Sequence, residues 1–298
     1  MNTRLKWLDI SKGIAIILMV VGHTSIPDVF SRFIFAFHMP LFFIASGWTT
    51  KWEKLKSCEF VVHRLKSIIL PFVYYSAIVL LVQIVTKGDG GVKLLNRLQY
   101  GWQGYALWFV PILFLASVLG RFIHMAHNIY FRYSAMLALV LFGAYLRYID
   151  LYLPWSLSSV PYACFFILLG TELNSFQRVI EKASLSLFIG CFVLTSLATF
   201  FGKMDMAWNA VFPVVPLIIG AVSGTLMVFI LSSYIDRHTE LLSKLLSKIG
   251  KETFVVVAFS QEIIILLHDY TSLHSVFCYF ILIVSLTMIA LAKNRLKS

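Results

Sequence analysis

Apolar residues recur along this chain in long runs separated by short polar stretches. A membrane-spanning helix takes ~20 residues, and ten windows are long and apolar enough to qualify. They fall at 12–30, 31–50, 67–86, 104–122, 133–149, 157–174, 184–202, 209–234, 253–268 and 274–292. The pattern predicts an all-α, polytopic transmembrane helical bundle of about ten spans, folded as a single integral-membrane domain over residues 1–298. Pro213 and Pro216 in the eighth window predict a kinked, tilted or broken helix there.

Composition supports an integral membrane protein. Hydrophobic residues make up 59% of the chain, charged residues only 13%, and the mean hydropathy is +0.85. Soluble domains carry about 25% charged residues. Cytoplasmic loops hold an excess of lysine and arginine, and 19 of the 25 such residues fall on the side of the N-terminus. Both termini are therefore predicted to be cytoplasmic.

The net charge of +11 does not point to nucleic acid. A nucleic-acid-binding domain gathers its basic residues on one water-facing surface, whereas here they are dispersed over short loops. The four cysteines lie far apart and form no CxxC or Cys/His cluster. No disulfide framework and no metal site is expected from them.

The stretch KGIAIILMVVGH, residues 12–23, begins and ends on a polar side chain. Lys12 and His23 are separated by ~16 Å along a helix and by only ~20° around it, so they share a face. Gly13 and Gly22 would let neighbouring helices approach closely. Counting along the second window places His38 at the depth of His23, about midway through the membrane.

The ninth window adds Gln261 and Glu262 near the same depth. Polar groups inside a membrane are costly, so they usually face a cavity and mark a functional path. Structural alternatives stay open: Lys12 can extend to the headgroups, the two histidines can make interhelical hydrogen bonds, and Glu262 can be a neutral buried acid.

Basic residues gather between the second and third windows. Arg64 and Lys66 stand at the entrance to the third helix, where a phosphate-bearing cytosolic ligand can bind. Contact with anionic membrane lipid explains the same charges equally well.

Four motifs together resemble the acyltransferase-3 family of membrane-bound acyltransferases, in particular its fucose 4-O-acetylase-like branch. The family's first helix carries a basic residue, ten intervening positions and a histidine, which Lys12 and His23 match. The other motifs are FHMPLFFIASG at 37–47, RLKSIILPF at 64–72 and LWFV at 107–110. Two positions depart from the family pattern: Ser67 replaces a second basic residue, and Ser260 replaces a histidine in the ninth span.

The resemblance implies an O-acetyltransferase of the bacterial inner membrane. It would move an acetyl group from acetyl-CoA to a sugar hydroxyl of a cell-surface polysaccharide or its lipid-linked precursor, with no permanently bound cofactor. We expect His23 to be the general base in direct transfer, with a two-step route in which His23 carries the acyl group left open. His38 would orient His23, position the acceptor or donate to the developing oxyanion. The residues expected to bind acyl-CoA are Lys12, Ser46, Arg64 and Lys66, and those expected to bind the acceptor are Trp108, Gln261 and Glu262.

Two other classes of protein fit part of the pattern. A proton-coupled transporter of a small molecule or an acylated glycan precursor would use the His/His/Glu set as a proton relay. No internal repeat supports that alternative. A non-catalytic membrane scaffold would not need the histidines at all.

Overall fold

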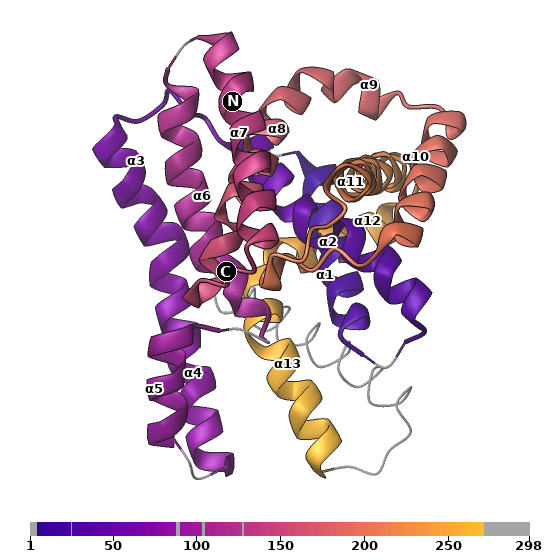
Figure 1. Cartoon of the computed structure of the whole chain (residues 1–298). Helices are drawn as coiled ribbons and strands as arrows, with labels where there is room; N and C mark the ends of the chain where they lie inside the picture. The colour runs from indigo at the N-terminus through magenta and orange to yellow at the C-terminus, as the bar shows by residue number, and fades with distance from the viewer. Residues whose placement is uncertain (1–4, 25, 88–89, 103–104, 127, 271–298) are drawn as a thin grey trace. The chain divides into compact units, whose positions relative to one another are not determined.

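The computed structural model describes residues 5–270, apart from residues 25, 88–89, 103–104 and 127 (Figure 1). This part of the chain is almost entirely helical and contains no β-strand. Its helices are α1 (Lys6–Gly22), α2 (Asp28–Thr49), α3 (Ser57–Arg64), α4 (Leu70–Lys87), α5 (Gly90–Tyr100), α6 (Phe109–His124), α7 (Ile129–Tyr148), α8 (Val160–Leu173), α9 (Gln177–Glu181), α10 (Leu185–Ala198), α11 (Val214–His238), α12 (Glu240–Lys251) and α13 (Thr253–Tyr270). The last predicted window, 274–292, lies outside the described residues.

Six continuous helical stretches of the described chain are long and apolar enough to cross a membrane. They are Asp28–Thr49, Ser57–Val85, Ala106–His124, Ile129–Tyr148, Pro154–Glu181 and Val214–His238. Two shorter apolar helices, Leu185–Phe201 and Thr253–Ile264, fall where further spans are predicted. The helical multi-pass class is therefore confirmed, while the number of ten spans and the cytoplasmic termini stay predictions.

The turn between the first two helices comes earlier than the apolar pattern indicates. The window 12–30 predicts one helix, but α1 ends at Gly22 and α2 begins at Asp28. The Thr24 hydroxyl donates back to a carbonyl of the last turn of α1, at 2.6 Å. Such a bond competes with continued helix, and Pro27 disfavours helical backbone in the residue before it. Two local signals thus override a continuous hydrophobic run.

The two prolines of the eighth window do not break a helix. Pro213 precedes α11, and Pro216 lies in its first turn, where a missing N–H costs nothing because that donor has no partner inside the helix. The 25 residues of α11 follow as one helix.

Two amphipathic helices occupy stretches predicted to be connections. α5 lies between the third and fourth windows, and α12 lies between the eighth and ninth. α12 buries a face of small residues and one leucine, comprising Ser243, Leu246, Ser247 and Gly250. Its sequence places lysines on another face, which is why its apolar content stays below that of a span.

The chain divides by packing into two compact units. The first contains the chain up to Phe42, the stretch Phe176–Met204 and the chain from Val215 onward. Within it α1 packs along α12 (Figure 1). Ile10 of α1, Leu246 of α12 and Ile235 of α11 form a buried cluster. The Lys6 ammonium pairs with Asp236 at 3.1 Å.

The second unit contains Phe43–Ser175 and Asp205–Val214. α8 forms its core, with α6 and α7 packed on it and Tyr162 and Phe166 fully buried. The end of α2 also lies directly on α8: a Cβ on Gly47 would stand 1.8 Å from the Ile167 carbonyl oxygen. Glycine is therefore required at this position of the FHMPLFFIASG motif.

Candidate functional site

The two histidines predicted to share a depth are adjacent. Their ring centroids lie 6.3 Å apart, with the ring planes at 84°. His23 directly follows Gly22 as the C-terminal cap of α1, and His38 is the eleventh of the 22 residues of α2. α2 therefore passes the end of α1 at its own midpoint. The short distance between the rings agrees with the shared depth expected for His23 and His38, and their catalytic roles stay predictions.

Each imidazole is oriented by a backbone carbonyl of its own helix. His23 Nδ1 lies 2.8 Å from the Met19 carbonyl oxygen, and His38 Nδ1 lies 2.9 Å from that of Ile34. A carbonyl only accepts, so each Nδ1 must carry the proton and donate. In a neutral ring this leaves Nε2 with a lone pair. Both histidines are thus held in the tautomer that a proton acceptor at Nε2 requires.

Phe35 joins the two histidines to a third basic residue. Its ring centroid lies 5.4 Å from that of His23 and 4.8 Å from that of His38. The Lys203 ammonium stands 3.6 Å from the same centroid, a cation–π contact. We call His23, Phe35, His38 and Lys203 the histidine cluster; all four belong to the first unit.

Lys203 was not among the predicted site residues. It follows α10 and the turn Thr199–Phe201, directly after Gly202, whose φ of 146° favours glycine at that position. One signal in the sequence could have singled it out. It is one of the few basic residues on the side predicted to be external, where topology does not call for positive charge.

The predicted donor-binding residues are spread over both units. Lys12 is half-buried on α1, in the first unit, eleven residues before His23. Ser46 is half-buried near the end of α2, and its carbonyl oxygen accepts the Thr50 hydroxyl at 2.6 Å. Lys66 is exposed in the π-helical turn Leu65–Ile69.

Arg64 is held by a hydrogen bond and by an aromatic ring. Its Nη2 donates to Thr50 Oγ1 at 2.5 Å, and its guanidinium lies 5.2 Å from the centre of the Phe60 ring. A second guanidinium, that of Arg121, lies 5.3 Å from the same ring centre. Trp52 stacks on Phe60, with 5.9 Å between centroids. These four residues, Trp52, Phe60, Arg64 and Arg121, are the arginine cluster, and all belong to the second unit.

The residues predicted to contact the acceptor are buried where their side chains are described. Trp108 is buried in the 3₁₀ turn Ala106–Trp108 that leads into α6. Glu262 is 3% exposed on α13. The side chain of Gln261, also on α13, lies outside the described residues. Within the described chain no three His, Cys, Asp or Glu side chains gather closely enough to hold a metal ion.

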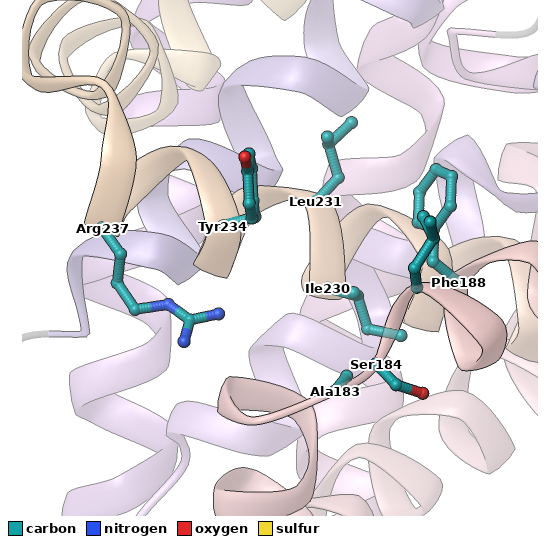
Figure 2. A pocket seen from close by; sticks show the side chains of 8 residues that line it. Ala183, Ser184, Phe188, Ile230, Leu231, Tyr234 and Arg237 are labelled. Carbon is teal, nitrogen blue, oxygen red and sulfur yellow. The ribbon is translucent and has the colours of Figure 1, made fainter.

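An apolar cavity of about 440 Å³ lies between α10 and α11, and no residue of either cluster lines it. Figure 2 shows Ile230, Leu231 and Phe188 on its walls and the Arg237 side chain beside it. None of its lining residues is a predicted site residue. Most of its lining residues are apolar, and Tyr234 and Arg237 are among the polar ones.

Comparison with known proteins identifies the family. The acyltransferase-3 family model, described as an acyltransferase domain, matches residues 5–292. No curated protein and no solved structure matches the chain. The match covers the histidine cluster, the arginine cluster and the apolar helices alike. This chain is a multi-pass membrane protein that belongs to the acyltransferase-3 family.

Proposed function

We propose that the protein is an O-acetyltransferase that moves an acetyl group from acetyl-CoA to a hydroxyl of a sugar in a cell-surface glycan or its lipid-linked precursor. The family membership supports acyl transfer, and the resemblance of the first two motifs supports the fucose 4-O-acetylase-like branch and a bacterial inner membrane. One observation carries the proposal. The Nδ1 hydrogen bond of His23 to Met19 leaves Nε2 as a base next to a second imidazole.

The reaction needs a base because a sugar hydroxyl is a poor nucleophile. His23 Nε2 removes the hydroxyl proton as the oxygen attacks the thioester carbonyl carbon. The carbon–sulfur bond then breaks, and the CoA thiolate receives the proton held by His23. The products are the O-acetyl sugar and CoA with a free thiol. A positioned base of this kind typically contributes ~10²- to 10⁴-fold to the rate.

Lys203 is suited to stabilise the negative charge that develops on the carbonyl oxygen. A cationic donor fixed close to the base stabilises that oxyanion without reorganisation during the reaction. The contact with Phe35 holds the Lys203 ammonium at one place beside the pair of imidazoles. His38, whose Nε2 carries a lone pair, orients the acceptor hydroxyl by accepting a hydrogen bond from it.

The donor's phosphates are assigned to the predicted cytosolic side. Lys12 and Arg64 would bind them with Lys66, and Ser46 would line the path of the thioester. Lys12 lies ~16 Å along α1 from His23, so one helix links the phosphate end to the base. In acetyl-CoA a long pantetheine arm joins the thioester to the phosphates, and this arm suits the separation between Lys12 and His23. Trp108, Gln261 and Glu262 remain assigned to the acceptor.

Acetyl transfer by purified protein tests the proposal directly. Protein in detergent receives acetyl-CoA labelled in the acetyl group together with an extract of lipid-linked sugars, and label in the glycan fraction and released thiol are both measured. Wild type should produce the two in equal amounts. The His23→Ala variant should lose at least about a hundredfold of this rate.

The matched control is His238→Ala, because His238 is exposed at the end of α11 and belongs to neither cluster. It should behave as wild type. A properly inserted His23→Ala protein that transfers acetyl at the wild-type rate would refute the role of His23.

A further inference from the structure

Arg121, in the last turn of α6, is buried with only part of its hydrogen-bonding capacity used. The residue is 2% exposed. Its Nη2 donates to the Leu55 carbonyl oxygen at 2.6 Å. Its Nε and Nη1 are also buried and have no hydrogen-bond partner among the described residues. Buried polar groups are nearly always bonded, so two idle donors on one side chain need an explanation.

The positive charge of Arg121, buried with the donors, also needs an explanation. No described carboxylate forms an ion pair with it. Glu172, an acid of the second unit, is engaged by Arg132 at 2.9 Å. A buried guanidinium without a counter-charge is costly to maintain, whereas one that meets an anion is stabilised by short charge-assisted hydrogen bonds. The position of Arg121 therefore favours an anionic ligand.

A second arginine is available to the same ligand. The guanidinium groups of Arg64 and Arg121 lie 5.2 and 5.3 Å from the centre of the Phe60 ring. Arg64 uses one donor on Thr50, and each guanidinium has five. Two such groups around one ring can bind a ligand with more than one phosphate oxygen.

The aromatic side chains hold this arrangement in place. Trp52 is stacked between Phe60 and His124, with centroids 5.9 and 5.3 Å apart. The indole Nε1 donates to Thr171 Oγ1 at 2.9 Å, which fixes the ring to α8. The arginine cluster is thus a rigid group of packed rings and cations. This differs from lysines on a lipid-facing helix, which bind headgroups as flexible, solvated charges.

We propose that Arg121 binds phosphate of the nucleotide part of the acyl donor together with Arg64. This inference rests on the proposed function for the identity of the ligand, because CoA carries the phosphates. Arg121 also lies on the side where cytosolic acyl-CoA would enter, according to the distribution of basic residues. It is a binding residue for the donor and takes no part in proton transfer.

Direct binding to the full-length protein in detergent tests this role without relying on turnover. Coenzyme A, inorganic pyrophosphate and S-acetylpantetheine, which has no phosphate, are titrated by calorimetry. Two variants distinguish the effect of the positive charge of Arg121 from the effect of its several N–H donors. In Arg121→Lys the ammonium can still donate to Leu55, but the two idle donors are gone; Arg121→Gln removes the charge as well. Arg178→Gln is the control, since Arg178 is exposed on α9 in the other unit.

Arg121→Gln should weaken binding of coenzyme A and of pyrophosphate by about tenfold or more, as expected for hydrogen bonds to a charged group. Arg121→Lys should fall between it and wild type, and Arg178→Gln should match wild type. Binding of S-acetylpantetheine should not change in any variant, which also shows that the variants are folded. A merely structural Arg121 would weaken all three ligands alike.

The outcomes separate this inference from the proposed function. Equal affinity of wild type and both Arg121 variants for coenzyme A overturns the phosphate role and leaves the acyltransfer proposal standing. Arg121-dependent binding of pyrophosphate by a protein that ignores coenzyme A supports the anion site and overturns acyl-CoA as its ligand. Wild type that binds neither compound overturns the inference.

Discussion

Gly13 of α1 and Gly250 of α12 lie against each other, backbone to backbone. A Cβ on Gly250 would stand 1.7 Å from the Asp9 carbonyl oxygen and 2.9 Å from the Gly13 nitrogen. A Cβ on Gly13 would stand 2.3 Å from the Leu246 carbonyl oxygen. Two glycines thus let the helices approach more closely than any side chain permits. Lys12, next to Gly13, is held at a fixed place by this contact.

Gly250→Ala should destabilise the protein by about 1–3 kcal/mol, because the added methyl forces α1 and α12 apart. Since Lys12 moves with α1, the KM for acetyl-CoA should rise as well. Thermal unfolding in detergent and steady-state kinetics measure the two effects. Gly190→Ala is the matched control: nothing lies within 4 Å of its Cβ, so it should leave stability unchanged or raise it slightly. Equal melting temperatures for both variants would contradict the close contact.

Lys203→Gln should lower kcat by at least about tenfold, because loss of an oxyanion donor typically costs ~10²–10³ in kcat. The KM for the donor should change little, since Lys203 belongs to the histidine cluster. Lys203→Arg keeps a cation against the Phe35 ring and should recover part of the rate. Lys244→Gln serves as the control, because Lys244 is exposed on α12 and paired with Glu240 on the same helix. A normal kcat for Lys203→Gln would remove this residue from the mechanism.

Arg64→Gln should raise the KM for acetyl-CoA by about tenfold, the expected loss for hydrogen bonds to a charged group, with a smaller change in kcat. Lys66→Gln should have a weaker effect, because Lys66 is exposed and lacks a described anchor. Thr50→Val leaves the Arg64 charge but removes its hydrogen-bond acceptor, and should fall between them. Initial rates measured against acetyl-CoA concentration give the KM of each of the three variants. An effect of Lys66→Gln as large as that of Arg64→Gln would place the phosphates elsewhere.

The histidine pair shows what a sequence can predict in such a fold. Helical rise alone placed His23 and His38 at one depth, and apolar runs alone gave the helical class, because both depend on local geometry. The same counting failed at the end of α1, where Thr24 and Pro27 act within one turn. The early end leaves the pair intact, since α2 reaches the level of His23 at its midpoint.

The contacts of Lys203 and Arg121 could not be predicted from the apolar pattern because their neighbours come from distant segments. Lys203 reaches Phe35 from more than 150 positions away along the chain, and Arg121 meets Phe60 from about 60 positions away. The spacing of apolar residues is a local property and does not predict contacts between distant segments. α12 was missed for another reason: it is amphipathic, and a search for apolar spans passes over helices whose charged face lowers their mean hydropathy.

Glu262 offers a way to separate the acyltransferase from a proton-coupled transporter. The carboxyl is 3% exposed on α13. A residue that relays protons must gain and lose one, which glutamine cannot do, whereas a residue that only holds a hydroxyl by hydrogen bonds tolerates the amide. Glu262→Gln should therefore keep acetyl transfer within about threefold of wild type, a change of less than 1 kcal/mol. Acetyl transfer and proton flux into dye-loaded proteoliposomes are measured on the same protein. Wild-type vesicles should show no substrate-driven proton flux. A flux that wild type supports and Glu262→Gln abolishes would favour the transporter.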